Sequence, residues 1–216
     1  MGLVDYSYEG FYARFDPTSQ KDGALLMGAD NIVGDDYEIV FKTEGERIVA
    51  WAKNRFGAEV GFFDIDTSRK LQLANARGQS IRGLLAFVAY SDTPEPGNYW
   101  GQMALFCFNP AYATEMNAFV DRCAAKLASG TRPNIDLGSQ AVEKIFSEPD
   151  WLPSETVPLP KKESGSAVLK DHQTMSEKAI NQGRAGNKGC YAVSWAFIII
   201  VVLAVLYFVA HLAGVL

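Results

Sequence analysis

Short stretches of β-branched and aromatic residues recur through the first half of the chain. Turn-forming pairs at Glu44-Gly45 and Phe56-Gly57 separate three of these stretches into a meander. We therefore expect strands within 8–15 and at 37–41, 47–52, 59–63, 81–90 and 99–108, whereas 24–33 forms an element of undetermined type.

Farther along the chain, apolar residues recur every three to four positions, which predicts helices. Asn109 suits the N-cap and Pro110 the first turn of a helix that ends at Ser129-Gly130. This helix is the longest one expected in the globular part of the chain. Its predicted apolar stripe holds Tyr112, Met116, Phe119, Val120, Cys123 and Leu127.

Two shorter helices complete the predicted elements of this part. One is capped by Asp66 or Thr67 and stops before Gly78, and the other covers 136–147. Their expected inward residues are Leu71 and Ala74 in the first, and Leu137, Ala141 and Ile145 in the second. Because strands come first and helices later, we expect an α+β domain at 1–148, a small antiparallel β-barrel or curled sheet with C-terminal covering helices.

The composition changes after this domain. Four prolines occur between 149 and 160, and two lysines and a polar run follow them. Too few apolar residues remain to build a core, so 149–190 is predicted to be a flexible linker. An alternative places a short helix at 167–183 on an anionic membrane leaflet, with the basic residues near the lipid surface. These basic residues are Lys170, Lys178, Arg184 and Lys188.

The end of the chain, 191–216, contains no Asp, Glu, Lys or Arg. Because about 20 apolar residues cross a bilayer as a helix, it is predicted to be one transmembrane helix, although a buried core helix is the alternative. Tyr191 and Trp195 would lie at one membrane interface, and Tyr207 and His211 at the other. Lys178, Arg184 and Lys188 precede this segment, which places the N-terminal domain in the cytosol by the positive-inside rule.

An apolar segment at the C-terminus, behind a domain without an N-terminal signal, resembles the architecture of tail-anchored membrane proteins. The resemblance implies insertion after synthesis and a single-pass membrane protein whose contacts include the lipid bilayer. The rest of the composition fits a cytosolic domain. Only three cysteines are present and no disulfide framework is visible, which indicates a reducing compartment.

The charge distribution argues against non-specific binding of nucleic acid. The chain has a formal net charge of -5, and 1–150 carry 14 Lys and Arg against 21 Asp and Glu. An acidic domain repels a phosphate backbone at long range. The basic residues Arg69, Lys70, Arg77 and Arg82 form the one local concentration of positive charge. They are a candidate ligand-binding site, and the alternative is a solvated face that balances neighbouring acids.

Catalytic and cofactor-binding patterns are missing from the expected domain. Both histidines, His172 and His211, fall in the linker and the anchor, so nucleophile systems that need imidazole are excluded from it. There is no glycine-rich phosphate loop and no zinc-binding pattern. Asp35, Asp36 and Glu38, and Asp64 and Asp66, are the remaining candidates, as ligands of Mg²⁺ or as carboxylates that share a proton. Turn formation and helix capping are the alternative roles. We expect no enzyme activity and no cofactor.

One stretch supports a resemblance to a known family. Residues 48–52, then Gly57-Ala58-Glu59-Val60-Gly61-Phe62-Phe63, a short helix, Gly78 and a strand from Ile81 resemble the second half of a HIRAN domain over about 36–108. The resemblance implies a small OB-like barrel and, in some members, binding of DNA ends. The acidic-Pro-Asn-Asp signature of that family is missing, and 42–46 read Lys-Thr-Glu-Gly-Glu instead. No DNA-contacting role is therefore carried over to any residue.

These observations lead to three hypotheses about function. The leading one is a membrane-tethered cytosolic binding or scaffold module that recruits a protein partner. The first alternative is a HIRAN-like nucleic-acid-binding domain anchored to the membrane. The second alternative is a carboxylate-dependent enzyme that uses no histidine.

Overall fold

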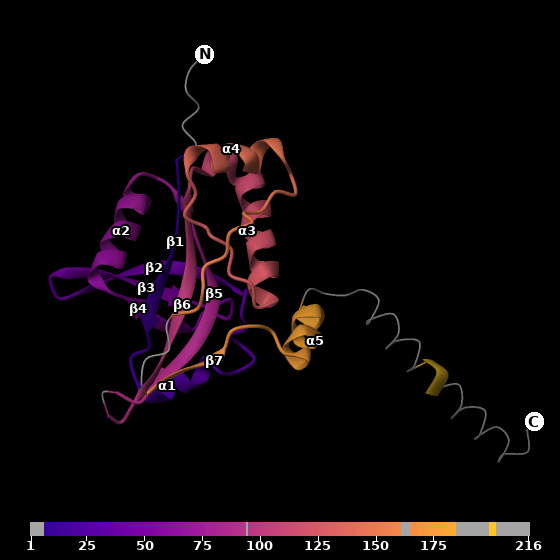
Figure 1. Ribbon diagram of the computed structural model, residues 1–216. Coiled ribbons are helices and arrows are strands. Elements are labelled where there is room, and N and C mark those ends of the chain that lie inside the picture. Colours follow the sequence, from indigo (N-terminus) through magenta and orange to yellow (C-terminus); the bar gives the residue numbers. More distant parts are fainter. Residues whose placement is uncertain (1–6, 94, 161–164, 185–198, 202–216) are drawn as a thin grey trace, which may run out of the picture. The chain divides into compact units, whose positions relative to one another are not determined.

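The predicted strands pair into a closed antiparallel β-barrel. The computed structural model describes residues 7–93, 95–160, 165–184 and 199–201 (Figure 1). Around the barrel the strand order is β2-β3-β4-β1-β6-β5, and β2 pairs with β5 to close the circle. The bounds are β1 (Tyr8–Asp16), β2 (Asp36–Glu44), β3 (Arg47–Lys53), β4 (Glu59–Phe63), β5 (Ser80–Ser91) and β6 (Asn98–Phe108). The expected α+β class and β-barrel are confirmed.

The meander β2-β3-β4 follows from its turns. Gly45 has a φ of +62° at the first position of the two-residue turn that joins β2 to β3. Such a turn matches the twist of the flanking strands, and glycine adopts its positive φ without steric cost. Gly57 also has a positive φ, +83°, and lies in the five-residue loop 54–58 between β3 and β4. Both turns lie where the sequence predicts them.

The inside of the barrel forms the first of two cores. It contains Phe15, Tyr37, Phe63, Leu85, Met103, Leu105 and Cys107. Helix α2 (Ile65–Ala76) packs against β3 and β5 and adds Leu71 and Ala74 to this core, as predicted. The N-cap of α2 is Asp64, whose Oδ1 accepts from the backbone N–H of Thr67 at 2.7 Å. The expected cap at Asp66 or Thr67 was therefore wrong, because Asp64 reaches the first free N–H groups of the helix.

A second core lies on the outside of β5 and β6, under α3 (Ala113–Ala128) and α4 (Ser139–Ser147). Because side chains alternate along a strand, Leu105 points into the barrel while Phe106 points toward α3. The Asn109 side chain caps the η1 turn (Pro110–Tyr112) that leads into α3, at 3.0 Å from the N–H of Ala111. In α3, five of the predicted stripe residues are buried: Met116, Phe119, Val120, Cys123 and Leu127.

The stretch left untyped by the sequence contains the end of α1 (Gln20–Leu25) and a loop. Ser19 caps α1, and its Oγ accepts from the N–H of Asp22 at 3.1 Å. In the loop, Ile32 and Val33 are fully buried, and Gly34 donates its N–H to the carbonyl of Leu85 at 2.8 Å. The loop thus leads the chain back to the barrel at the start of β2.

The expected flexible linker differs from the structure over residues 150–160 and 165–173. The chain divides into two compact units, and the first one extends to Gln173. Strand β7 (Ser166–Lys170) pairs antiparallel with β5, with Ser166 opposite Ser91. Upstream of β7, the backbone N–H of Val157 bonds to the carbonyl of Arg132 at 2.8 Å. Backbone pairing to an existing strand needs few apolar residues, so composition did not reveal this contact.

The second unit begins at Thr174 and contains α5 (Met175–Arg184). Thr174 and Glu177 form a capping box: Thr174 Oγ1 accepts from the N–H of Glu177 at 3.3 Å, and Glu177 Oε2 accepts from the N–H of Thr174 at 2.9 Å. Lys178 and Arg184 lie on α5, whereas Lys188, Tyr191, Trp195, Tyr207 and His211 lie outside the described residues. The expected helix at 167–183 was partly wrong, since its first part is β7. Among the described residues, no helix is both long and apolar enough to span a bilayer.

Candidate functional site

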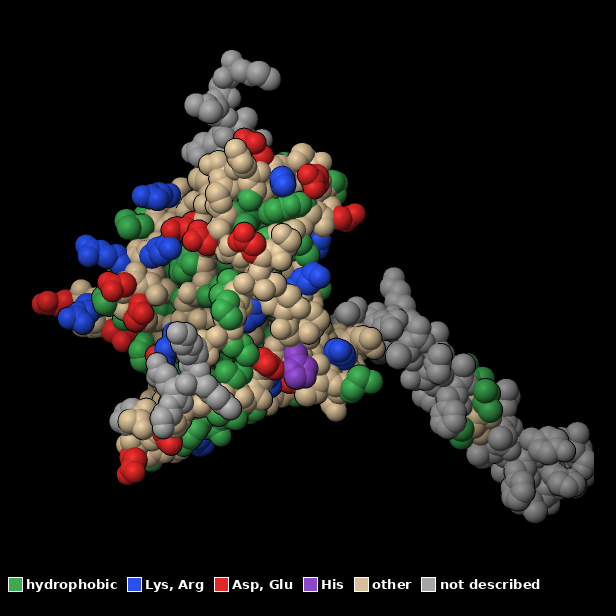
Figure 2. All heavy atoms as spheres, viewed as in Figure 1, with side chains coloured by type: hydrophobic (Ala, Val, Ile, Leu, Met, Phe, Trp, Pro, Cys, Tyr) green, Lys and Arg blue, Asp and Glu red, His purple; other side chains and the backbone are tan. Residues whose placement is uncertain are grey.

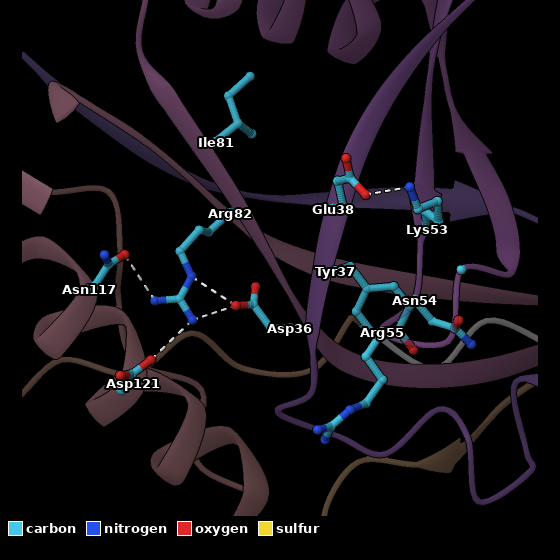
Figure 3. Close-up of a pocket in the computed structure, with 11 residues that line it drawn as sticks. Asp36, Tyr37, Glu38, Lys53, Asn54, Arg55, Ile81, Arg82, Asn117 and Asp121 are labelled. Carbon is cyan, nitrogen blue, oxygen red and sulfur yellow. Dashed lines mark hydrogen bonds and ion pairs between the residues drawn. The ribbon is translucent and has the colours of Figure 1, made fainter.

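A groove of about 810 Å³ opens on the barrel beside α3 (Figure 3). Its walls come from the start of β2, the turn between β3 and β4, the start of β5, and α3. We call it the β2–α3 groove. Its lining includes three acidic and three basic side chains, Asp36, Glu38, Asp121, Lys53, Arg55 and Arg82.

Arg82 is the centre of one side of the groove. From β5 it donates to Asp36 Oδ2 on β2 at 2.9 and 2.5 Å, to Asp121 Oδ1 on α3 at 3.0 Å, and to Asn117 Oδ1 on α3 at 3.1 Å (Figure 3). Burial lowers the pKa of Arg82, but hydrogen bonds and charge from Asp36 and Asp121 outweigh it, so the pKa lies above its ordinary value. Arg82 therefore joins three elements as a permanent cation.

Glu38 and Lys53 form a second pair on the other side. They face each other across β2 and β3, with Lys53 Nζ 2.5 Å from Glu38 Oε2. The Glu38 side chain is 62% exposed, so water screens the attraction. A pair this exposed contributes little to the free energy of folding. Both side chains can therefore turn toward a ligand with little loss of free energy.

Arg55 is the cation of the groove that stays unpaired. It lies in the β3–β4 turn, is exposed, and forms no ion pair with any residue that the structure describes. Its guanidinium carbon lies 5.9 Å from the ring centre of Phe56, a side chain that is itself 58% exposed. In Figure 3 the Arg55 guanidinium extends without a bond to the other groove residues. Arg55 can therefore accept a carboxylate from outside.

A buried polar network holds the turn that carries Arg55. Asn54 Oδ1 accepts from the N–H groups of Phe56 and Ala58, both at 3.0 Å. Asn54 Nδ2 donates to Asn31 Oδ1 at 3.2 Å, and the hydroxyl of Tyr37 donates to the same oxygen at 2.8 Å. The network ties the turn to β2 and to the loop after α1, so the backbone under Arg55 is fixed before any ligand arrives.

The structure separates the four basic residues that the sequence grouped as a ligand site. Arg69 and Lys70 lie on α2, and Lys70 pairs with Glu9 at 2.8 Å. Arg77 is the C-cap of α2 and lines a different hollow of about 520 Å³. Of the four, only Arg82 lines the β2–α3 groove. Figure 2 shows Lys and Arg side chains interspersed with Asp and Glu on the visible face.

Sequence reasoning missed Lys53 and Arg55 as site residues. Both precede the predicted turn at Phe56-Gly57, and a cationic residue beside a glycine turn was the available signal. Nothing in the sequence showed that this turn faces α3. The turn and α3 line the same groove only because the barrel closes between β2 and β5.

Four of the five candidate carboxylates, Asp35, Asp36, Glu38 and Asp64, have structural partners. Asp35 is buried and its Oδ2 accepts from the N–H of Ile32 at 3.2 Å, and Asp36 pairs with Arg82. Asp64 caps α2, and Asp66 lies in the first turn of that helix. Within the described residues, no three His, Cys, Asp or Glu side chains are grouped so that they could hold a metal ion.

Cys107 and Cys123 are free and buried, one in each core. Burial raises the pKa of each thiol to about 12. Since the thiolate is the reactive form, neither cysteine is a nucleophile at neutral pH. They pack as small apolar side chains in the two cores.

No protein-family model, curated protein or solved structure matches this chain. The resemblances to tail-anchored proteins and to the HIRAN domain therefore stay predictions. The support for the candidate site is the position, exposure and contacts of its residues.

Proposed function

We propose that this protein is a membrane-tethered module whose first unit faces the cytosol and recruits a protein partner through the β2–α3 groove. The observation that carries the proposal is the exposed, unpaired guanidinium of Arg55 in a groove whose other cations are paired. The tether is the predicted apolar helix at 191–216.

The charges of the groove suit a polar protein surface. Arg82 and Lys53 already have carboxylate partners within the groove, whereas Arg55 has none among the described residues. A partner carboxylate on Arg55 makes charge-assisted hydrogen bonds, which are about twice as strong as neutral ones. The paired acids and bases around it reject a partner that carries a single sign of charge.

The described groove residues support binding rather than catalysis. They include no histidine, cysteine, serine or threonine. The carboxylates among them, Asp36, Glu38 and Asp121, each bond to Lys53 or Arg82. A general base needs a carboxylate free to take a proton, so the carboxylate-enzyme alternative has less support.

The nucleic-acid alternative has less support for a similar reason. Arg82 is held by two carboxylates and Lys70 by Glu9, so both positive charges are largely balanced. A phosphate backbone requires several cations along one track.

The test compares partner capture by full-length variants in detergent. Wild-type protein, Arg55→Ala and a control Arg69→Ala are immobilised in equal amounts, and the captured proteins are quantified by mass spectrometry. Arg69 is a suitable control because it is also an exposed arginine but lies on α2. The proposal predicts at least one protein whose recovery falls about tenfold in Arg55→Ala and is unchanged in Arg69→Ala. Identical captured sets for all three proteins would overturn it.

A further inference from the structure

The barrel is closed over only a short length between β2 and β5. These strands pair at Asp36 with Leu84 and at Tyr37 with Gly83. Beyond Tyr37, β2 continues to Glu44 without a partner on this side in the described part of the chain, while its other side pairs with β3 to the end. The open edge of β2 therefore starts where the β2–α3 groove lies.

The direction of the backbone groups on this edge follows from one hydrogen bond. The N–H of Leu85 donates to the carbonyl of Asp35 at 3.1 Å, so Asp35 turns its backbone oxygen toward β5. Backbone groups in a strand alternate sides, and Tyr37, opposite Gly83, continues the same series. The N–H and C=O groups of Ile39, Phe41 and Thr43 must then point to the open edge.

The open edge of β2 contrasts with the free edge of its neighbour β3. There, α2 supplies the missing bonds: the N–H of Ala50 donates to Ser68 Oγ at 3.0 Å, and Gln72 Nε2 donates to the carbonyl of Ile48 at 2.7 Å. No comparable side chain from the described residues reaches Ile39, Phe41 or Thr43. Charged residues such as Lys42 and Glu44 are a common protection of exposed edges against aggregation.

The side chains around this edge define what fits it. Ile39, Phe41 and Ile81 lie on its inner side, half-buried against the barrel core. On the outer side lie the Glu38–Lys53 pair and the unpaired Arg55. A strand placed here presents alternate residues to these two sides, apolar ones inward and an acidic one toward Arg55.

The geometry points to β-strand addition: an extended peptide segment of a partner, with alternating apolar and acidic residues, pairs with the β2 edge at Ile39, Phe41 and Thr43 and places a carboxylate on Arg55. This inference rests on the proposed function and specifies its partner. Main-chain hydrogen bonds supply affinity in such complexes, and pockets for alternate side chains supply specificity.

A random peptide library displayed on phage is the probe, panned on the full-length chain in nanodiscs. One enriched peptide is then synthesised, and its dissociation constant is measured with three variants. Thr43→Pro removes one edge N–H without touching the bonds to β3, and Thr43→Ala is its control because it keeps that N–H. Arg55→Ala removes the cation.

Strand addition predicts enrichment of peptides that alternate apolar and acidic residues. It also predicts binding at least about tenfold weaker in Thr43→Pro and Arg55→Ala, with Thr43→Ala near wild type. Thermal unfolding of Thr43→Pro near the wild-type temperature confirms that the fold is intact. Weakening by Arg55→Ala alone would overturn strand addition and leave the groove as the binding site. A panning without enrichment would overturn strand addition, whereas the groove proposal is decided separately by the capture comparison of Arg55→Ala with Arg69→Ala.

Discussion

The ammonium of Lys170 lies 2.9 Å from the carbonyl oxygen of Asn31, 139 residues earlier in the chain. It also donates to the carbonyls of Leu26 at 3.3 Å and Gly28 at 3.2 Å. A buried lysine at the end of β7 thus holds the loop after α1. Asn31 in turn accepts from Tyr37 and Asn54, so the same loop supports the turn that carries Arg55.

Removal of this ammonium should destabilise the first unit. In Lys170→Met the three carbonyls lose their charged donor inside the protein, which we expect to cost about 3 kcal/mol in the free energy of unfolding. The measurement is urea denaturation of the full chain in detergent, with Lys21→Met as control. Lys21 is exposed, so its replacement should change stability by less than about 0.5 kcal/mol. Equal effects of the two substitutions would show that Lys170 is not a structural anchor.

The buried thiols should make stability fall at alkaline pH. Cys107 and Cys123 have a pKa of about 12 in the fold, above the value of about 8.5 expected in the unfolded chain. Their contribution is fully present below about pH 8.5 and is lost as pH rises toward 12, at up to about 1.4 kcal/mol per thiol per pH unit.

The check compares unfolding free energies at about pH 8 and about pH 10.5 for wild type and for the double variant Cys107→Ala, Cys123→Ala. The variant should be less stable than wild type at about pH 8, but its loss between the two pH values should be smaller. Burial raises the pKa of Tyr12 in both proteins alike, so the difference between the slopes isolates the thiols. Parallel slopes would contradict the expectation.

Short single-stranded DNA should not bind with saturation at physiological salt. Lys70 and Arg82 are paired with acids, and the chain carries a net charge of -5, so few cations remain for phosphates. Fluorescence anisotropy at low and at physiological salt measures this. Saturable binding that disappears when Arg69, Arg77 and Arg82 become Ala would instead favour the nucleic-acid hypothesis.

The full-length chain should sediment with membranes after cell lysis and resist alkaline carbonate extraction. An uncharged apolar segment as long as 191–216 is more stable in lipid than in water. A chain that ends at residue 190 is the control, and it should appear in the supernatant. Full-length protein that stays in the supernatant without detergent would remove the tether from the proposed function.

Local patterns were sufficient to predict much of the fold. Turn glycines such as Gly45 and Gly57, and the β-branched and aromatic stretches that they separate, located the meander, because strand and turn chemistry is local. The Asn109 cap and the apolar stripe that includes Phe119 located α3 for the same reason. Which strands close the barrel could not be predicted, since β1 inserts between β4 and β6 through contacts distant in sequence.

The candidate site was less predictable. Arg69, Lys70 and Arg77 were grouped with Arg82 because they are near in sequence, but Arg82 points to α3 through Asn117 and Asp121. Strand β7 was missed because Ser166–Lys170 is a short run in a mostly polar stretch and ends in a lysine, and its pairing with β5 is a contact distant in sequence. The grouping of the basic residues and the missed strand both depend on contacts between residues that are distant in sequence.

The most direct test of groove binding is site-specific photocrosslinking in cells. Benzoylphenylalanine replaces Phe56, an exposed aromatic residue between the groove residues Arg55 and Gly57, and in a control it replaces Leu73, which is 52% exposed on α2. We predict a protein adduct at position 56 that is lost on the additional change Arg55→Ala and is not formed from position 73. The same adducts from both positions, unaffected by Arg55→Ala, would contradict the account.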